Sequence, residues 1–354
     1  MRRKKVEGMN FLELHNQKEN RVAREKERRK ESISQSYKLV RNVLISGTMI
    51  GLGIYLFTLW YFNVIPEKSF YELDLNRIEG IVSEVTQPLQ YGDVNFEMYS
   101  EFALLINLTT SRILFEHQAD VPTYPASVTK IMTVLIGLEN AQLDDEVTVT
   151  ADFDALFLAG ASQAGFISGE VRTLEEILYG IMLPSGAEAT WALANHVAGS
   201  YDGFVAMMNE KAAEIGMNHT NFVTATGLHD ENHYTTARDM AILLEYALQN
   251  DAFREIFTTD TYQLSRANTR GDVMSSTLYT FAPRMTFDNG RILGGRTGFT
   301  TPAGRCLASL ATNGQDEFIL ITFGAPDPDF TNQTIHILDA LTIYDYFLMP
   351  YDRW

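Results

Sequence analysis

A run of about 23 uncharged residues, Val43 to Ile65, divides this chain into two unequal parts. As a helix, such a run is long enough to cross roughly 30 Å of hydrocarbon. Residues 1–42 hold 13 Lys or Arg against 6 Asp or Glu, a net charge of +7, whereas the whole chain carries −17. Because basic flanks stay on the cytoplasmic side, the sequence predicts a single-pass membrane anchor at 43–65, with 1–42 in the cytoplasm and the acidic remainder outside.

The anchor and its flanks suggest further hypotheses. A cleaved signal peptide is the alternative, although Asn63-Val64-Ile65-Pro66 at the end of the run offers no small-x-small cleavage site. Gly47 and Gly51 form a G-x-x-x-G motif, which favours a transmembrane dimer, and the basic segment predicts attraction to anionic membrane lipid. Residues 66–100 show no strong periodicity and are interpreted as an extracytoplasmic stalk, leaving 101–354 for one folded domain.

Composition narrows the chemistry of that domain. Its only cysteine is Cys306, which excludes an intrachain disulfide and lies in an apolar strand pattern that favours a buried structural role. The seven histidines have no metal-ligand spacing, and His229 and His233 lie in a turn where loop-bracing hydrogen bonds are the expected role. We expect no metal and no cofactor. The strongly acidic charge argues against nucleic acid as a partner.

The run Pro125 to Leu135 places a serine and a lysine three residues apart at the start of an apolar helix. A serine hydroxyl is a poor nucleophile until a base lies within hydrogen-bond reach, and a spacing of i, i+3 puts both side chains on one helical face. Burial of the helix should lower the pKa of Lys130, so that its neutral amine can accept a proton. We therefore interpret Ser127 as a nucleophile and Lys130 as its base; the alternative is a serine N-cap before a surface lysine.

Two further motifs follow in the chain. Ser185-Gly186-Ala187 comes directly before a helical pattern, and Arg296-Thr297-Gly298-Phe299 lies in a glycine-flanked strand pattern. The order S-x-x-K, S-x-N, K-T-G is typical of serine-lysine acyl-transfer enzymes. Here the three motifs read S-x-x-K, S-G-A and R-T-G.

With these motifs the chain resembles the D-alanyl-D-alanine carboxypeptidases, which are low-molecular-weight penicillin-binding proteins. The resemblance extends from about residue 103 to about 348 and includes the run His229 to Asp239. It implies that Ser127 attacks the peptide bond between two terminal D-alanines of a peptidoglycan stem peptide, that Lys130 takes the proton and that Ser185 passes it to the leaving amine. It also implies that β-lactam antibiotics are inhibitors.

The resemblance implies roles for the third motif as well. Arg296 and Thr297 would hold the substrate carboxylate, Gly298 would belong to the same substrate-binding strand, and the backbone amides of Ser127 and Phe299 would form the oxyanion hole. Arg296 replaces the family's usual lysine; it keeps the charge but is a poor proton relay. Ala187 replaces the usual asparagine, and the lost hydrogen bonds should cost about 1 to 3 kcal/mol unless Glu188 or an ordered water compensates.

Other functions stay open at this point. A DD-transpeptidase differs only in the acceptor, and a membrane-tethered wall-binding or scaffold protein would keep the cleft without turnover. A β-lactamase needs a deacylating glutamate, and the nearest match, Glu245, falls in a helix pattern.

Periodicity predicts an α+β fold in which a five-stranded, largely antiparallel sheet has helices on both faces, in agreement with the transpeptidase/β-lactamase-like fold that the resemblance implies. The expected strands are Ala103 to Leu108, Arg112 to His117, Ile292 to Phe299, Arg305 to Ala311 and Glu317 to Phe323. Besides the helix after Ser127, the expected helices are Thr173 to Ile181, Glu188 to Val197, Asp202 to Ile215, Ala237 to Asn250 and Thr334 to Leu348.

Overall fold

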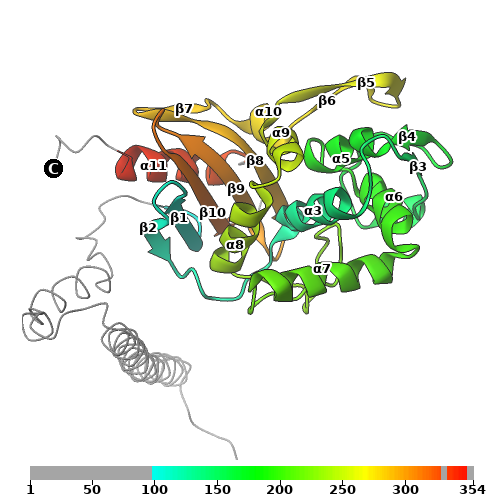
Figure 1. Cartoon of the computed structure of the whole chain (residues 1–354). Coiled ribbons are helices and arrows are strands. Elements are labelled where there is room, and N and C mark those ends of the chain that lie inside the picture. Colours follow the sequence, from blue (N-terminus) through cyan, green and yellow to red (C-terminus); the bar gives the residue numbers. More distant parts are fainter. Residues whose placement is uncertain (1–97, 328–332, 349–354) are drawn as a thin grey trace, which may run out of the picture. The chain divides into compact units, whose positions relative to one another are not determined.

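A six-stranded antiparallel sheet with the order β2-β1-β10-β9-β8-β7 forms the centre of the computed structural model, which describes residues 98–327 and 333–348 (Figure 1). The predicted segments 1–42 and 43–65 lie outside these residues. No helix in the described ranges is long and apolar enough to span a membrane. The strands of the sheet are β1 (Phe102–Asn107), β2 (Arg112–His117), β7 (Thr286–Phe287), β8 (Gly290–Thr300), β9 (Gly304–Thr312) and β10 (Glu317–Ala325).

Alternation along the strands gives the sheet two buried faces. In β1, Leu104 belongs to one apolar cluster, whereas its neighbours Ala103 and Leu105 belong to the other. The second cluster also contains Ile337 and Tyr344 of α11 (Ile335–Phe347), while the first contains the remaining large helices. Figure 1 shows α11 on one face of the sheet and α8 on the opposite face. The prediction of helices on both faces is therefore confirmed.

The expected count of five strands is wrong, because β7 adds a sixth. β7 is only two residues long and pairs through Thr286↔Arg291 and Phe287↔Gly290, so it is too short to show any alternation in the sequence. β8 pairs with β9 along its length, from Arg291↔Thr312 to Thr300↔Gly304. Two short ribbons lie outside the sheet: β3 (Glu146–Thr148) with β4 (Val171–Thr173), and β5 (Thr261–Asn268) with β6 (Gly271–Ser275).

The helices largely match the predicted ranges. One predicted helix, Ala237 to Asn250, runs three residues too far, since α8 ends at Ala247 and Asn250 instead starts the next helix, which was not predicted, by accepting a hydrogen bond from the Phe253 N–H. Six helices contribute to the apolar cluster that contains Leu104: α3 (Lys130–Asn140), α5 (Leu174–Met182), α6 (Ala187–Ala198), α7 (Tyr201–Ile215), α8 (Ala237–Ala247) and α9 (Asp251–Thr258). Two short helices are α4 (Phe153–Leu158) and α10 (Thr277–Phe281).

Of the predicted stalk, only residues 98–100 are described. Ser100 is buried, and both its N–H and its hydroxyl donate to the Asp339 carboxylate of α11, at 2.7 and 2.6 Å. The neighbouring Tyr99 N–H donates to the same carboxylate at 3.0 Å. These three bonds fix the start of the described chain to the outer helix before β1 begins.

Candidate active site

Ser127 lies in a 3₁₀ helix, η2 (Ala126–Thr129), which leads directly into α3. The sequence predicts an α-helix here; a 3₁₀ helix has three residues per turn, so side chains at i and i+3 lie almost directly above each other. Ser127 and Lys130 form such a pair, and Lys130 Nζ lies 3.2 Å from Ser127 Oγ. The local departure from α-helical geometry therefore brings the predicted nucleophile and base together.

Lys130 is buried because α3 is the central helix of the apolar layer, and only 2% of its surface is exposed. Nζ donates a hydrogen bond to the carbonyl of Thr226. Burial lowers the pKa of Lys130 well below its ordinary value, the charge of Arg296 lowers it further, and Glu188 opposes both. The direction predicted from the apolar helix is confirmed. A lysine with a lowered pKa has more of the neutral amine that can accept the Ser127 proton.

Ser185 precedes α6 with its backbone in the left-handed region, at a φ of 72°. Its hydroxyl donates to Ser127 Oγ at 3.1 Å. The next residue, Gly186, is held by a hydrogen bond to the Gly180 carbonyl, and a Cβ at this position would lie 2.7 Å from the Ala164 side chain. Tight packing of the turn thus fixes an unusual serine conformation that aims the hydroxyl at the nucleophile.

Arg296 of β8 is fully buried, and its guanidinium connects three segments of the site by hydrogen bonds. Nε donates to the Ser127 carbonyl at 3.1 Å, Nη1 to the Met182 carbonyl at 3.0 Å and Nη2 to Ser185 Oγ. Among the described residues, no carboxylate accepts a hydrogen bond from the guanidinium. Its positive charge therefore has no counter-ion in the described part of the chain. Burial lowers the pKa of Arg296 to about 9, so the group stays cationic at neutral pH. The arrangement produces a positive field around Ser127 and Ser185.

The rest of the third motif lies along the same strand. Thr297 is buried, and its hydroxyl is 2.7 Å from that of Thr277, the first residue of α10. At Gly298 the strand passes so close to η2 that a Cβ would lie 2.9 Å from the Ser127 nitrogen and 3.1 Å from the Ala126 Cβ. Glycine is therefore required where β8 meets the nucleophile.

A second glycine, Gly227, packs against η2 from the opposite loop. Its φ is +78°, and a Cβ would lie 1.9 Å from the Ala126 carbonyl oxygen. This contact places the preceding Thr226 carbonyl against Lys130. Tyr201 supports the same loop, because its hydroxyl accepts the Ala225 N–H at 2.9 Å. The loop before Gly227 thus supplies an acceptor for the Lys130 amine.

His233 braces this loop against η2. Nδ1 accepts the N–H groups of Val223 and Thr224, at 3.0 and 3.3 Å. Because Nδ1 is an acceptor, the proton belongs on Nε2, which donates to Thr129 Oγ1 at 2.8 Å, and Thr129 in turn donates to the Ala126 carbonyl. Burial lowers the pKa of His233 to about 4. The bracing role predicted for this histidine is confirmed.

Ala187 is buried and presents only a methyl group at the position of the family's asparagine. The adjacent Glu188 accepts hydrogen bonds through Oε1 from the N–H groups of Ala164, Gly165 and Phe166, at 2.7, 2.8 and 3.2 Å. Its other oxygen, Oε2, has no hydrogen-bond partner among the described residues. Burial raises the pKa of Glu188, and its backbone hydrogen bonds oppose that shift. Glu188 positions the loop at 164–166 and affects Lys130 only through its charge.

Metal chemistry has no support among the described residues, where no group of three or more His, Cys, Asp or Glu side chains is placed to hold an ion. Cys306 is buried, as predicted, and burial raises the pKa of its thiol to about 12.

A sequence profile of the D-alanyl-D-alanine carboxypeptidase family, peptidase family S11, matches residues 85–327. The chain belongs to this family. Among curated relatives, D-alanyl-D-alanine carboxypeptidase DacF of Bacillus subtilis is 34% identical over 247 residues, which are 67% of this chain and 60% of DacF. DacC of Escherichia coli is 32% identical over 63% of this chain and 56% of its own length. The chain thus spans under two thirds of the length of these two relatives.

A solved S11-like structure agrees with the fold. The Streptomyces K15 DD-transpeptidase superposes with a TM-score of 0.63 at 27% identity, covering 72% of this chain and 98% of the transpeptidase chain. The similarity therefore includes nearly the whole of that smaller protein. Within this family's fold, Ser127, Lys130, Ser185 and Arg296 meet in one cluster, as the motifs predict.

Sequence reasoning missed three contributors to the site: Thr226, Gly227 and Thr277. Thr226 acts through its carbonyl, which no side-chain pattern reports, and Thr277 contacts Thr297 only because α10 packs against β8. Gly227 had a readable signal, since a glycine after a strand-like run often adopts a positive φ.

The buried neutral His233 predicts a pH dependence of stability. Its folded pKa of about 4 lies below the ordinary value of 6.5, so the unfolded chain binds more protons between these values. The free energy of unfolding should therefore fall as pH decreases from 6.5 to 4, and a His233→Gln variant, whose amide offers an acceptor and a donor but does not titrate, should lose about 2 kcal/mol less over this window. Denaturant unfolding at several pH values measures both slopes. Buried His336 is present in both proteins and cancels; equal slopes would contradict the assignment.

Proposed function

We propose that this chain is a serine D-alanyl-D-alanine carboxypeptidase that removes the terminal D-alanine from peptidoglycan stem peptides. One observation carries the proposal: Ser127 Oγ lies within hydrogen-bond reach of both Lys130 Nζ and Ser185 Oγ, beside the buried Arg296, which has no counter-ion among the described residues. A nucleophile, a base of lowered pKa and a proton relay are the parts that acyl transfer needs.

The first half of the reaction forms an acyl-enzyme. Neutral Lys130 accepts the Ser127 proton while Oγ attacks the carbonyl carbon of the penultimate residue. The backbone amides of Ser127 and Phe299 stabilise the oxyanion, each donor contributing about 3 kcal/mol. The proton then moves from Lys130 through Ser185 to the leaving nitrogen, the C–N bond breaks, and D-alanine departs. Water hydrolyses the resulting ester.

In this reaction the Arg296 guanidinium acts on the substrate through its charge. It does not form a bidentate hydrogen-bonded pair with the substrate carboxylate. Four hydrogen bonds to Ser127, Met182, Ser185 and Thr277 already occupy most of its N–H groups. The terminal carboxylate of the substrate therefore binds Thr297 in the positive field above Arg296. This division of labour also explains how arginine serves where the family uses lysine, since no deprotonation is required of it.

The acceptor distinguishes two candidate reactions. Water gives the carboxypeptidase, which the names of the curated relatives favour, whereas an amine gives the transpeptidase named for the Streptomyces K15 structure. A β-lactamase is disfavoured, because Glu245, the nearest sequence match to a deacylating glutamate, lies within the helix α8 and not in a loop. A wall-binding protein without turnover is the outcome to be excluded by experiment.

Mass spectrometry of the full chain in detergent tests this proposal. Incubation with penicillin should add one penicillin mass to a peptide that contains Ser127, and a peptide ending in D-Ala-D-Ala should lose one alanine. Ser127→Ala should abolish both, because the bond-forming oxygen is gone. An added amine acceptor that appears in the product would assign transpeptidation. A folded protein with neither adduct nor cleavage would leave a wall-binding role.

We also propose that residues 43–65 anchor the domain outside the cell membrane. The support is the uncharged run and the basic flank of 1–42, both in the sequence. The full chain should stay with membranes after an alkaline carbonate wash, whereas a chain that lacks residues 1–65 should be released. Release of the full chain by carbonate would argue against the anchor.

A further inference from the structure

The start of α10 is held between the end of α5 and the strand β8. The Thr277 N–H donates to the Leu183 carbonyl at 3.1 Å, just after α5. On the strand side, the Tyr279 hydroxyl donates to the Leu293 carbonyl at 2.7 Å, and a Cβ at Gly295 would lie 2.8 Å from a side chain of α10. Figure 1 shows α10 beside β8. Thr277 is therefore fixed next to the third motif.

The hydroxyl of Thr277 has two neighbours in that motif. Its Oγ1 lies 2.7 Å from Thr297 Oγ1 and 3.5 Å from Arg296 Nη1. The other hydrogen of Nη1 goes to the Met182 carbonyl at 3.0 Å. A guanidinium has only donors, so the Thr277 oxygen accepts from Arg296. Its own hydrogen is then left for Thr297.

This order determines the direction of the next hydroxyl. Thr297 Oγ1 accepts from Thr277, and its hydrogen has no acceptor among the described residues. We name Arg296 Nη1, Thr277 Oγ1 and Thr297 Oγ1 the hydroxyl chain. Each donor polarises the hydroxyl that follows it, and the charge at the buried end strengthens the effect. The last hydrogen of the hydroxyl chain is free to bind an acceptor in the site.

A carboxylate needs a hydroxyl that donates. An ionised carboxylate only accepts hydrogen bonds, so a Thr297 hydroxyl that spent its hydrogen on Thr277 would present only lone pairs to it. The proposed reaction places the terminal carboxylate of the substrate at Thr297. The hydroxyl chain therefore lets the enclosed Arg296 act on the carboxylate through two hydroxyl groups, although Arg296 itself is fully buried.

We propose that Thr277 is a positioning residue for substrate recognition: by donating to Thr297, it leaves the Thr297 hydroxyl as a donor to the terminal carboxylate. This inference rests on the proposed function, because the carboxylate comes from it. Thr277 acts through Thr297 and takes no part in the proton transfers at Ser127. It thus affects how tightly the peptide binds before D-alanine leaves.

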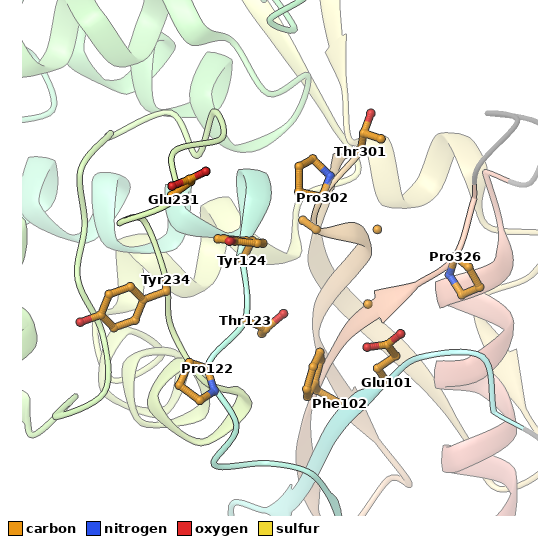
Figure 2. Close-up of a pocket in the computed structure, with 13 residues that line it drawn as sticks. Glu101, Phe102, Pro122, Thr123, Tyr124, Glu231, Tyr234, Thr301, Pro302 and Pro326 are labelled. Carbon is orange, nitrogen blue, oxygen red and sulfur yellow. The ribbon is translucent and has the colours of Figure 1, made fainter. Parts of the chain in front are cut away.

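The hydroxyl chain is separate from the groove of about 540 Å³ at the other end of the motif, where β8 turns into β9 (Figure 2). Tyr124, Glu231 and Pro302 are among the residues that line this groove, whereas no residue of α10 does, nor does Thr297. A substitution at Thr277 therefore leaves the residues of the groove unchanged.

Kinetics of the full chain in detergent test the inference. Thr277→Val has a similar shape but no hydroxyl, and it should raise KM for Nα,Nε-diacetyl-L-Lys-D-Ala-D-Ala about fivefold, the effect of one ordinary hydrogen bond. The kcat should stay within about twofold, because the interaction is made in the bound substrate and is lost when D-alanine departs. Thr277→Ser keeps the hydroxyl and should restore the original KM.

A substrate without the carboxylate separates recognition from folding. The p-nitrophenyl ester of Nα,Nε-diacetyl-L-Lys-D-Ala acylates the same serine but has a leaving group without a carboxylate, so Thr277→Val should leave its kcat/KM unchanged. Thr280→Val is the matched control: this exposed threonine of α10 donates to the Ser276 carbonyl at 2.8 Å, and its loss should leave both substrates unaffected.

Three results would count against the inference. An unchanged KM for the peptide in Thr277→Val would show that Thr297 needs no partner to direct its hydrogen. An equal loss on the peptide and the nitrophenyl ester, or failure of Thr277→Ser to restore KM, would show a general structural role. If the unchanged protein releases no D-alanine from the peptide, the proposed function itself fails, and the role of Thr277 fails with it.

Discussion

The buried guanidinium of Arg296 is the interaction on which the rest of this site depends. It donates to the backbone of Ser127, to Met182 and to the hydroxyl of Ser185, so that one side chain ties β8, η2 and the segment before α6 together. Its charge has no carboxylate partner among the described residues. The cost of burying it is offset in part by these hydrogen bonds, and the remaining positive field lowers the pKa of Lys130 and attracts an anion.

Close backbone packing holds Ser127 in a fixed position beside this charge. Gly298 and Gly227 let β8 and the loop before His233 approach η2 from two sides, where any Cβ would collide with the backbone of residues 126 and 127. The nucleophile is thus held by rigid neighbours, which preorganises it for attack.

The sequence predicted the long, strongly periodic strands β1, β2, β8, β9 and β10 because alternation is visible over six or more residues. It did not predict β7, whose two residues carry no pattern. It also extended α8 to Asn250, the residue that caps α9, and so missed α9. Ser127, Lys130, Ser185 and Arg296 were found because their chemistry lies in side chains at fixed spacing. The Thr226 carbonyl and the Thr277 hydroxyl were not, since tertiary packing alone brings them to the site.

The central claim is that burial and Arg296 make Lys130 a base, and titration of the lysine side chains by NMR, with the nitrogens labelled, tests it most directly. Lys211 is an internal reference: burial disfavours its charge, but hydrogen bonds with Glu214 and Glu139 raise its pKa overall. A Lys130→Arg variant assigns the signal. The account predicts that Lys130 loses its proton at a pH well below that of Lys211 and of the other lysines. Titration of Lys130 together with the exposed lysines would contradict it.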